Sequence, residues 1–133
     1  MKRMLPMLLL LSFAITGCAA SATLSETNTY RQITMVEAVE LMEKEENHLI
    51  LDVRTQQEYA AGHIPGAIVI PNESISTEEI PQLPDKDQLI MVYCRSGNRS
   101  KQASDKLVKL GYTNIVEFGG IIDWHGETVS CME

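Results

Sequence analysis

The chain has 133 residues, of which 44% are hydrophobic and 22% are charged. These proportions fit one ordinary globular domain and exclude a disordered or fibrous chain. The formal net charge of −7 argues against a nucleic-acid-binding surface, which needs clustered cations, but it leaves room for a small anionic substrate in a locally positive pocket.

The amino-terminal end differs from the rest of the chain. Two basic residues are followed by an apolar run that is too short to span a bilayer as a helix, so residues 1–17 are predicted to be a signal peptide. The sequence Ile-Thr-Gly-Cys, which ends at Cys18, resembles the bacterial lipobox, in which the cysteine is lipidated. An ordinary secretory signal cleaved near Ala20 or Ala22 is the alternative.

Residues 18–29 are small and polar, as expected for a lipidated tether ahead of a domain at residues 30–133. Acyl chains on Cys18 would hold the protein at a membrane. The expected location is therefore the bacterial cell envelope, either lipid-anchored or periplasmic.

Strand and helix patterns alternate through the domain. The expected strands are Tyr30–Ile33, His48–Val53, a run ending at Pro71, Gln88–Tyr93 and Asn114–Phe118. The expected helices follow the Thr34–Glu37 capping box, cover Thr55–Gly62 and Arg99–Tyr112, and weakly occupy Glu73–Pro84, where Pro81 and Pro84 break the pattern. This alternation favours an α/β fold with a parallel sheet covered on both faces.

Cys94 follows directly on the clearest buried strand, where open α/β sheets place their ligand sites. The next helix directs unpaired N–H groups and its positive dipole end toward this loop. Gly97 can adopt backbone conformations that let the loop curl, and Arg95 and Arg99 add positive charge. All of these features favour the thiolate, which is the nucleophilic form of cysteine. Cys94 is therefore the candidate nucleophile, with an anion site above it.

Several alternatives stay open at this level. Cys94 could be a small buried hydrophobic residue, and Arg99 could pair with a structural acid. As a cation at a helix amino terminus, Arg99 is unfavourable unless an anion offsets its charge. The hydroxyls of Ser96 and Ser100 could donate to the sulfur or cap the helix. Cys131 is either a thiol in a frayed tail, a disulfide partner of Cys94 that would block its chemistry, or a redox centre.

Three segments carry a resemblance to a known family. The loop CRSGNRS at Cys94–Ser100 resembles the active-site loop of rhodanese-like sulfurtransferases. The segment Leu51–Pro71, with its D-x-R and G-H-I-P-G-A elements, is similar to the first characteristic block of that family, and Val116–Trp124 resembles its closing G-G-x-x-x-W segment. The resemblance implies a single-domain rhodanese-like α/β fold with a mostly parallel five-stranded sheet and helices on both faces.

The resemblance also implies sulfane-sulfur transfer. The Cys94 thiolate would take sulfur from thiosulfate, a polysulfide or a persulfide and pass it to cyanide or a thiol. The substrate-binding residues would be those of the loop, namely Arg95, Ser96, Gly97, Asn98 and Arg99. The other residues that match the family motifs are expected to be structural; they are Asp52, Arg54, Glu58, His63 and Trp124. Among them, Arg54 and Glu58 are expected to pair on one helical face. No metal cluster is visible in the sequence, and no cofactor is expected.

Two other functions are alternatives to sulfur transfer. A cysteine phosphatase or arsenate reductase has its arginine at the sixth position after the cysteine, whereas Arg99 stands at the fifth after Cys94, so the loop is one residue short. A noncatalytic sulfur carrier or binding module of the cell envelope, which hands sulfur to a protein acceptor, is the second alternative.

Overall fold

The computed structural model describes residues 28–131. The predicted signal peptide, Cys18 and most of the predicted tether lie outside the described residues. The strands are β1 (Arg31–Gln32), β2 (His48–Asp52), β3 (Ile68–Val69), β4 (Leu89–Cys94) and β5 (Ile115–Gly120). The helices are α1 (Met35–Lys44), α2 (Gln56–Ala61) and α3 (Asn98–Lys109), with short 3₁₀ turns at Asn72–Ser74 and Ile121–Asp123.

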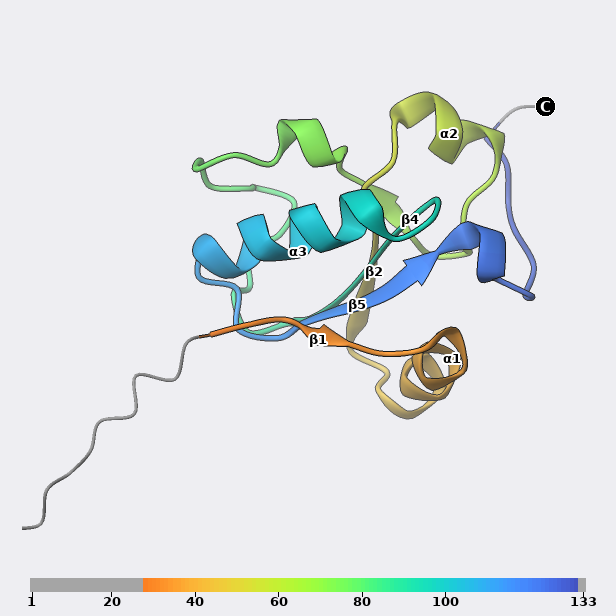
Figure 1. Cartoon of the computed structure of the whole chain (residues 1–133), viewed down its shortest axis with the longest axis horizontal. Coiled ribbons are helices and arrows are strands. Elements are labelled where there is room, and N and C mark those ends of the chain that lie inside the picture. Colours follow the sequence, from red (N-terminus) through yellow and green to blue (C-terminus); the bar gives the residue numbers. More distant parts are fainter. Residues whose placement is uncertain (1–27, 132–133) are drawn as a thin grey trace, which may run out of the picture.

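The strands form one five-stranded sheet in the order β1-β5-β4-β2-β3. Every pairing is parallel, which confirms the expected α/β architecture. β4 lies at the centre, and all six of its residues are buried, as a strand covered on both faces requires. Because the strands run in one direction, their carboxyl ends share one edge of the sheet (Figure 1).

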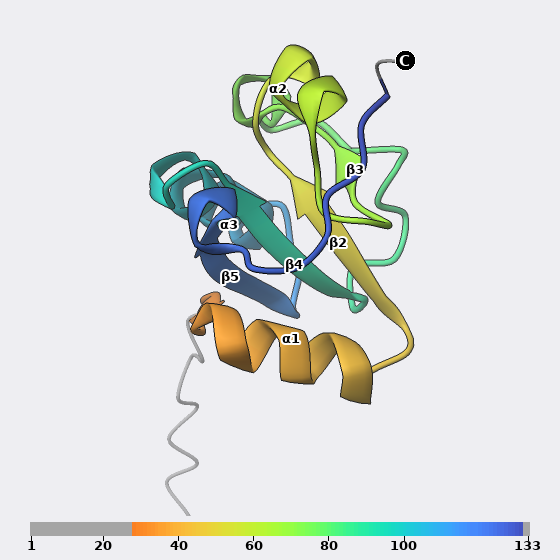
Figure 2. The same ribbon diagram turned by 90° about the vertical axis from the view of Figure 1, so that its right-hand side faces the viewer.

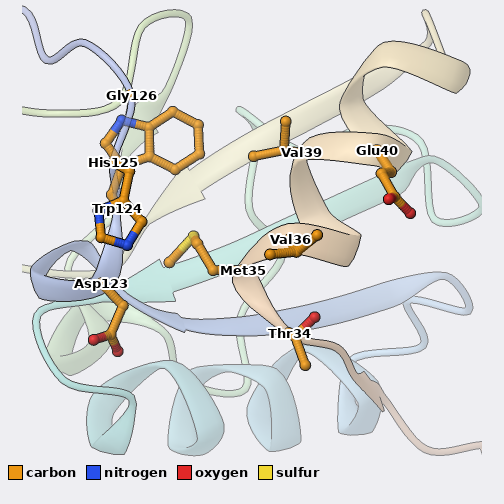
Figure 3. A pocket seen from close by; sticks show the side chains of 9 residues that line it. All are labelled: Thr34, Met35, Val36, Val39, Glu40, Asp123, Trp124, His125 and Gly126. Atoms are coloured by element: carbon orange, nitrogen blue, oxygen red, sulfur yellow. The ribbon is translucent and has the colours of Figure 1, made fainter.

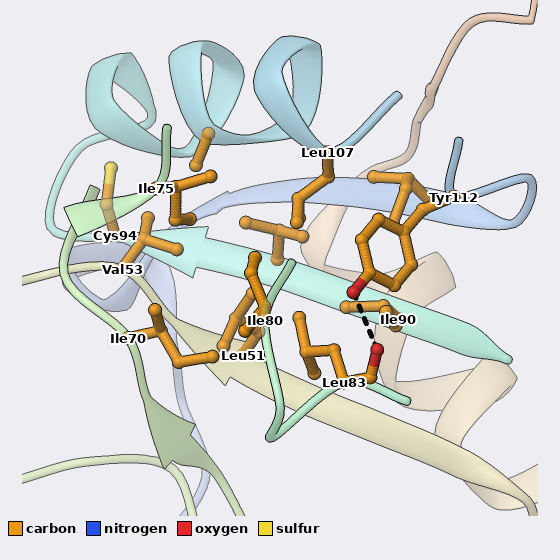
Figure 4. Close-up of a cluster of buried hydrophobic side chains, with 13 residues drawn as sticks. Leu51, Val53, Ile70, Ile75, Ile80, Leu83, Ile90, Cys94, Leu107 and Tyr112 are labelled. Carbon is orange, nitrogen blue, oxygen red and sulfur yellow. Dashed lines mark hydrogen bonds between the residues drawn. The ribbon is translucent and has the colours of Figure 1, made fainter. Parts of the chain in front are cut away.

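Helices cover both faces of the sheet. Helix α1 lies along one face, and α3 lies along the other (Figure 2). Side chains alternate along β4, so that Ile90, Val92 and Cys94 join the cluster under α3, whereas Met91 and Tyr93 join the cluster on the α1 side. Figure 4 shows Cys94 at one end of the α3-side cluster.

Local sequence signals explain where the helices begin. The Thr34–Glu37 capping box is present at the start of α1, as predicted. A second capping box, Thr55–Glu58, was not anticipated and fixes the start of α2. Helix α3 begins at Asn98, one residue before the expected start, after Gly97 with a left-handed φ of 104°. Each reciprocal box satisfies amide groups that the helix itself leaves unpaired.

The weak helix expected over Glu73–Pro84 is wrong. Beyond the 3₁₀ turn at Asn72–Ser74 this segment consists of bends and turns and forms no further helix. Its apolar residues Ile75, Ile80 and Leu83 are instead buried in the cluster under α3. Burial of these side chains by an irregular segment outweighs a helical propensity that Pro81 and Pro84 already weaken.

In the part of the chain from residue 28 to residue 131, none of the helices has the length and apolar character needed to cross a membrane.

Candidate active site

Cys94 is the last residue of β4, at the carboxyl edge of the sheet. The ladder between β4 and β5 shifts register between Val92 and Cys94, which places Cys94 opposite Gly120. The residue is only 1% exposed. Its sulfur nevertheless has polar neighbours, because the Gly97 amide donates a hydrogen bond to Sγ at 3.0 Å and Ser100 Oγ lies 3.4 Å from it. Cys94 is therefore buried without being an ordinary core residue.

The surroundings of the sulfur favour its ionised form. Burial raises the pKa of the Cys94 thiol, because it disfavours the charged state. Hydrogen bonds from the Ser100 hydroxyl and from the amides of Ser100, Gly97 and Ser96 act in the opposite direction and prevail, so the pKa of Cys94 lies below its ordinary value. The predicted group of main-chain donors is thus present around the sulfur.

The loop that supplies these donors is pressed against β5. A Cβ atom on Gly120 would lie only 2.0 Å from the Arg95 carbonyl oxygen, so only glycine allows the two backbones to come this close. The Ile122 amide also donates to that oxygen, at 3.3 Å. The closing Gly-Gly segment therefore holds the cysteine loop in place through its lack of side chains.

Three loop residues assigned to substrate binding, Arg95, Ser96 and Asn98, are exposed, whereas Gly97 is buried. Among the described residues, the Arg95 guanidinium has no ion-pair partner. Arg95 lines an open hollow of about 510 Å³ together with Arg54, Glu58 and Ile122. Cys94 itself is buried and does not line this hollow; the loop contributes Arg95 to the lining.

The Arg99 side chain points to α2. Its guanidinium forms a two-pronged ion pair with Glu58, with Nη1 to Oε2 at 2.8 Å and Nη2 to Oε1 at 3.0 Å. Glu58 therefore supplies the anion that offsets a cation in the first turn of α3. The hydrogen bond from Arg99 is the main reason that the pKa of Glu58 falls to about 2. A substrate role for Arg99 stays a prediction that concerns its backbone amide.

The expected pairing of Arg54 with Glu58 is wrong. Arg54 is turned inward, where its Nη2 lies 2.7 Å from Asp52 Oδ2 and donates to the Gly62 carbonyl at 2.7 Å. Tyr93 also donates to Asp52 Oδ2, at 2.7 Å. Asp52 is fully buried, and a buried carboxylate is stable only when several donors satisfy it.

His63 and Trp124 lie outside the sulfur's immediate surroundings. His63 stacks on Tyr59 and its Nδ1 lies 2.8 Å from the Tyr59 carbonyl oxygen, as expected for a structural loop histidine. Trp124 is half-buried rather than a core anchor; it packs against the α1-side cluster, and its Nε1 donates to Glu127. Trp124 also borders an apolar groove beside α1, which includes Met35 and Val36 (Figure 3).

Glu117 is a site residue that the sequence reading missed. It is 3% exposed on β5, and its Oε1 accepts hydrogen bonds from Ser100 Oγ at 2.6 Å and from the Gly119 amide at 2.9 Å. The available signal was a single charged residue inside an otherwise apolar strand pattern. The Ser100 hydroxyl thus lies between the Glu117 carboxylate and the Cys94 sulfur.

Cys94 and Cys131 are both free thiols, so the disulfide considered between them is not formed. Cys131 is exposed, and its amide donates to the Ala60 carbonyl at the end of α2. Within residues 28–131, no group of three or more His, Cys, Asp or Glu side chains is arranged to hold a metal ion.

Comparison with known proteins agrees with this geometry. The model of the rhodanese-like domain family matches residues 34–127. The chain is 37% identical over 73 residues to the thiosulfate sulfurtransferase PspE of Escherichia coli K12, covering 55% of this chain and 70% of that protein. It is 43% identical over 86 residues to a sulfurtransferase of Allochromatium vinosum, covering 61% of this chain and 77% of that protein.

A solved structure described as a rhodanese with anions from E. coli superimposes with a TM-score of 0.57 at 36% identity, covering 62% of this chain and 98% of that one. The fold and the family match together define a rhodanese-like α/β domain. The chain belongs to the rhodanese-like domain family, and it is a sulfurtransferase of the rhodanese type.

Proposed function

We propose that Cys94 is the nucleophile of this sulfurtransferase and carries the transferred sulfur as a persulfide. With thiosulfate as donor, the Cys94 thiolate attacks the outer sulfur, the sulfur–sulfur bond of thiosulfate breaks, and sulfite leaves with the bonding electron pair. Cyanide or a thiolate then attacks the outer sulfur of the persulfide, and the Cys94 thiolate leaves. A polysulfide or persulfide donor follows the same two displacements, and two separate displacements give ping-pong kinetics.

One observation carries this proposal: the Cys94 sulfur is buried at the carboxyl edge of the sheet, yet it accepts a hydrogen bond from the Gly97 amide and its pKa is lowered. The same donors suit the terminal sulfur of a persulfide, which is also anionic. Arg95, exposed at the hollow above, would attract the anionic donor. Ser96, Gly97, Asn98 and Arg99 would complete the substrate loop through their backbone.

Mass spectrometry of the protein after incubation with thiosulfate tests the proposal directly. The peptide that contains Cys94 should gain the mass of one sulfur atom, and cyanide should remove it. The Cys94→Ser variant should neither gain the mass nor form thiocyanate, whereas Cys131→Ser should behave like the wild type. A Cys94→Ser variant that still forms thiocyanate would refute the proposal.

The geometry opposes the phosphatase alternative. A phosphatase loop uses its arginine to bind phosphate, but the Arg99 guanidinium is held by both carboxylate oxygens of Glu58. An aryl phosphate assay beside the thiosulfate–cyanide assay should therefore show activity only in the latter. A protein that accepts sulfur from the Cys94 persulfide is compatible with the same chemistry.

We also propose that Cys18 is lipidated and holds the protein at a membrane of the cell envelope. This proposal rests on the sequence of the first 18 residues alone. Metabolic labelling with a fatty-acid analogue should mark the wild type but not Cys18→Ala. Labelling of both proteins, or of neither, would contradict a lipid anchor at this position.

A further inference from the structure

The Ser100 hydroxyl lies between two groups that can each lose a proton. On one side is Cys94 Sγ, at 3.4 Å, and on the other is Glu117 Oε1, at 2.6 Å. All three residues are buried, with Ser100 fully so. The Gly97 carbonyl is also within reach of the hydroxyl, at 3.0 Å. The carboxylate is the stronger acceptor, because a hydrogen bond to a charged oxygen is shorter and stronger than one to a neutral carbonyl.

The chain formed by Cys94, Ser100 and Glu117 has fewer hydroxyl protons than hydrogen bonds. The chain from sulfur to hydroxyl to carboxylate contains two hydrogen bonds, but the hydroxyl supplies only one proton. A second proton completes the chain in either of two ways. It can sit on Cys94, with Ser100 donating to a charged Glu117, or it can sit on Glu117, with Ser100 donating to the thiolate. Both forms have the same proton count and the same net charge of −1.

Removing the second proton would leave two negative charges on either side of one hydroxyl in a buried site, which is costly. Few other charges face these groups. Arg99 of α3 acts on Cys94 from a distance but is paired with Glu58, and Arg95 lies outside in the loop. The register partners of Glu117 in the sheet, Gln32 on β1 and Val92 on β4, are uncharged, and Cys94 shares its cluster with apolar residues such as Val53. The Gly119 amide also donates to Glu117 Oε1, at 2.9 Å.

We propose that Cys94, Ser100 and Glu117 share one proton, and that Glu117 receives the thiol proton through Ser100 when the sulfur ionises. In this step the S–H bond breaks as the sulfur's proton moves to Ser100 Oγ, and the Ser100 proton moves to Glu117 Oε1. The products are a thiolate, an unchanged hydroxyl and a neutral carboxylic acid. Glu117 is thus a positioning residue that acts on the nucleophile through Ser100.

This inference rests on the proposed role of Cys94 as the nucleophile and explains how the sulfur can ionise in a buried place. The charge of the site does not change, so no proton has to cross to solvent before the thiolate attacks its donor. The same chain can return the proton if Cys94 leaves as a thiolate and rests as a thiol.

The rate of alkylation of Cys94 by iodoacetamide, followed by peptide mass spectrometry across pH, tests the sharing of a proton. Because thiolate is the reactive form, a shared proton gives two macroscopic steps separated by a plateau in which the thiolate fraction is independent of pH. The wild type should show this two-step profile. Glu117→Gln, which cannot accept the proton, should show a single step, and so should Ser100→Ala, which breaks the chain.

Ser104→Ala is the matched control. Its hydroxyl is buried on the same face of α3, one turn beyond Ser100, and has no hydrogen-bond partner among the described residues. Ser104→Ala should keep the two-step profile. A single step in the wild type, or two steps in Glu117→Gln, would overturn the inference.

If Glu117→Gln does not fold, the alkylation profiles of the wild type and of Ser100→Ala still test whether the proton is shared. Infrared spectroscopy should then show the carbonyl band of a protonated carboxylic acid in the wild type at the pH of the plateau. The absence of that band overturns the inference. Alkylation reports on the thiol itself, so failure of this inference is distinguishable from failure of persulfide formation.

Discussion

Cys94 combines two properties that ordinarily oppose each other, since it is buried and the pKa of its thiol is lowered. Burial alone would keep the thiol protonated and inert. The amide of Gly97 and the hydroxyl of Ser100 each contact the sulfur directly, and they reverse the effect of burial on the pKa of the thiol. The lowered pKa of this thiol therefore depends on its few polar neighbours and not on its exposure.

Arg95 is the residue through which an anionic donor is expected to be recognised. Its guanidinium is exposed and, within residues 28–131, makes no ion pair. Arg95→Ala should raise the KM for thiosulfate about fivefold and leave kcat nearly unchanged, because an exposed charge contact contributes about 1 kcal/mol. Lys101→Ala, which removes an exposed cation on α3, should leave both constants unchanged. Steady-state kinetics checks this, and an unchanged KM in Arg95→Ala would contradict it.

Two secondary-structure elements meet in the ion pair of Glu58 and Arg99, which joins the start of α2 to the start of α3. Glu58 has a second task, because its Oε2 accepts the amide of Thr55 at 2.9 Å in the capping box. One carboxylate thus fixes a helix terminus and binds the cation beside the cysteine loop. This double use explains why its pKa falls to about 2.

The pH dependence of stability follows from that lowered pKa. The folded state holds Glu58 ionised down to about pH 2, whereas the ordinary value is 4.5, so the stabilisation is complete above about pH 4.5 and is lost as the pH falls to 2. Glu58→Gln should lower the free energy of unfolding by about 1 kcal/mol at pH 7 and by almost nothing near pH 2. Denaturant unfolding at both pH values measures these losses. The control variant is Glu79→Gln, which removes the carboxylate of an exposed ion pair with Lys86. An equal loss at both pH values would disprove the link.

The contact of the cysteine loop with β5 leads to another expectation. Gly120→Ala would place Cβ 2.0 Å from the Arg95 carbonyl oxygen, so the loop must move. Displacing a reacting group by about 1 Å costs about 100-fold in rate, and we expect a loss of kcat/KM of about this size. Gly62→Ala is the matched control, because its backbone is extended and its Cβ would meet only Thr128 Oγ1 at 3.8 Å. Wild-type kinetics in Gly120→Ala would show that the loop adapts.

For the molecule as a whole, the parallel sheet predicts where stability is concentrated. β4 is buried over its full length and lies between β2 and β5, whereas the two-residue strand β1 lies at the sheet edge. Native-state hydrogen exchange should give the amide of Val92 the free energy of global unfolding. The amide of Ile33, which follows β1 and donates to the Glu117 carbonyl at 3.0 Å, should show a much lower value from local opening. Similar protection at both amides would contradict this distribution.

The alternation of strands and helices could be predicted from sequence because hydrophobic periodicity records which faces of each element are buried. The partners of the charged side chains could not be predicted from sequence. Arg54 and Glu58 have the spacing of a helical pair, yet Arg54 precedes the helix and turns inward to Asp52, while Glu58 reaches Arg99, 41 residues away. Glu117 was missed for the same reason, since only the packing of α3 on β5 brings Ser100 to it.

The amino-terminal end of the described chain enters the domain far from the sulfur. The Asn28 side chain donates to the Tyr112 carbonyl just beyond α3, whereas the Cys94 sulfur accepts a hydrogen bond from the Gly97 amide at the start of that helix. The six residues of β5 separate the two ends by about 20 Å. The chain therefore enters the described domain at one end of α3 and holds its sulfur near the other end.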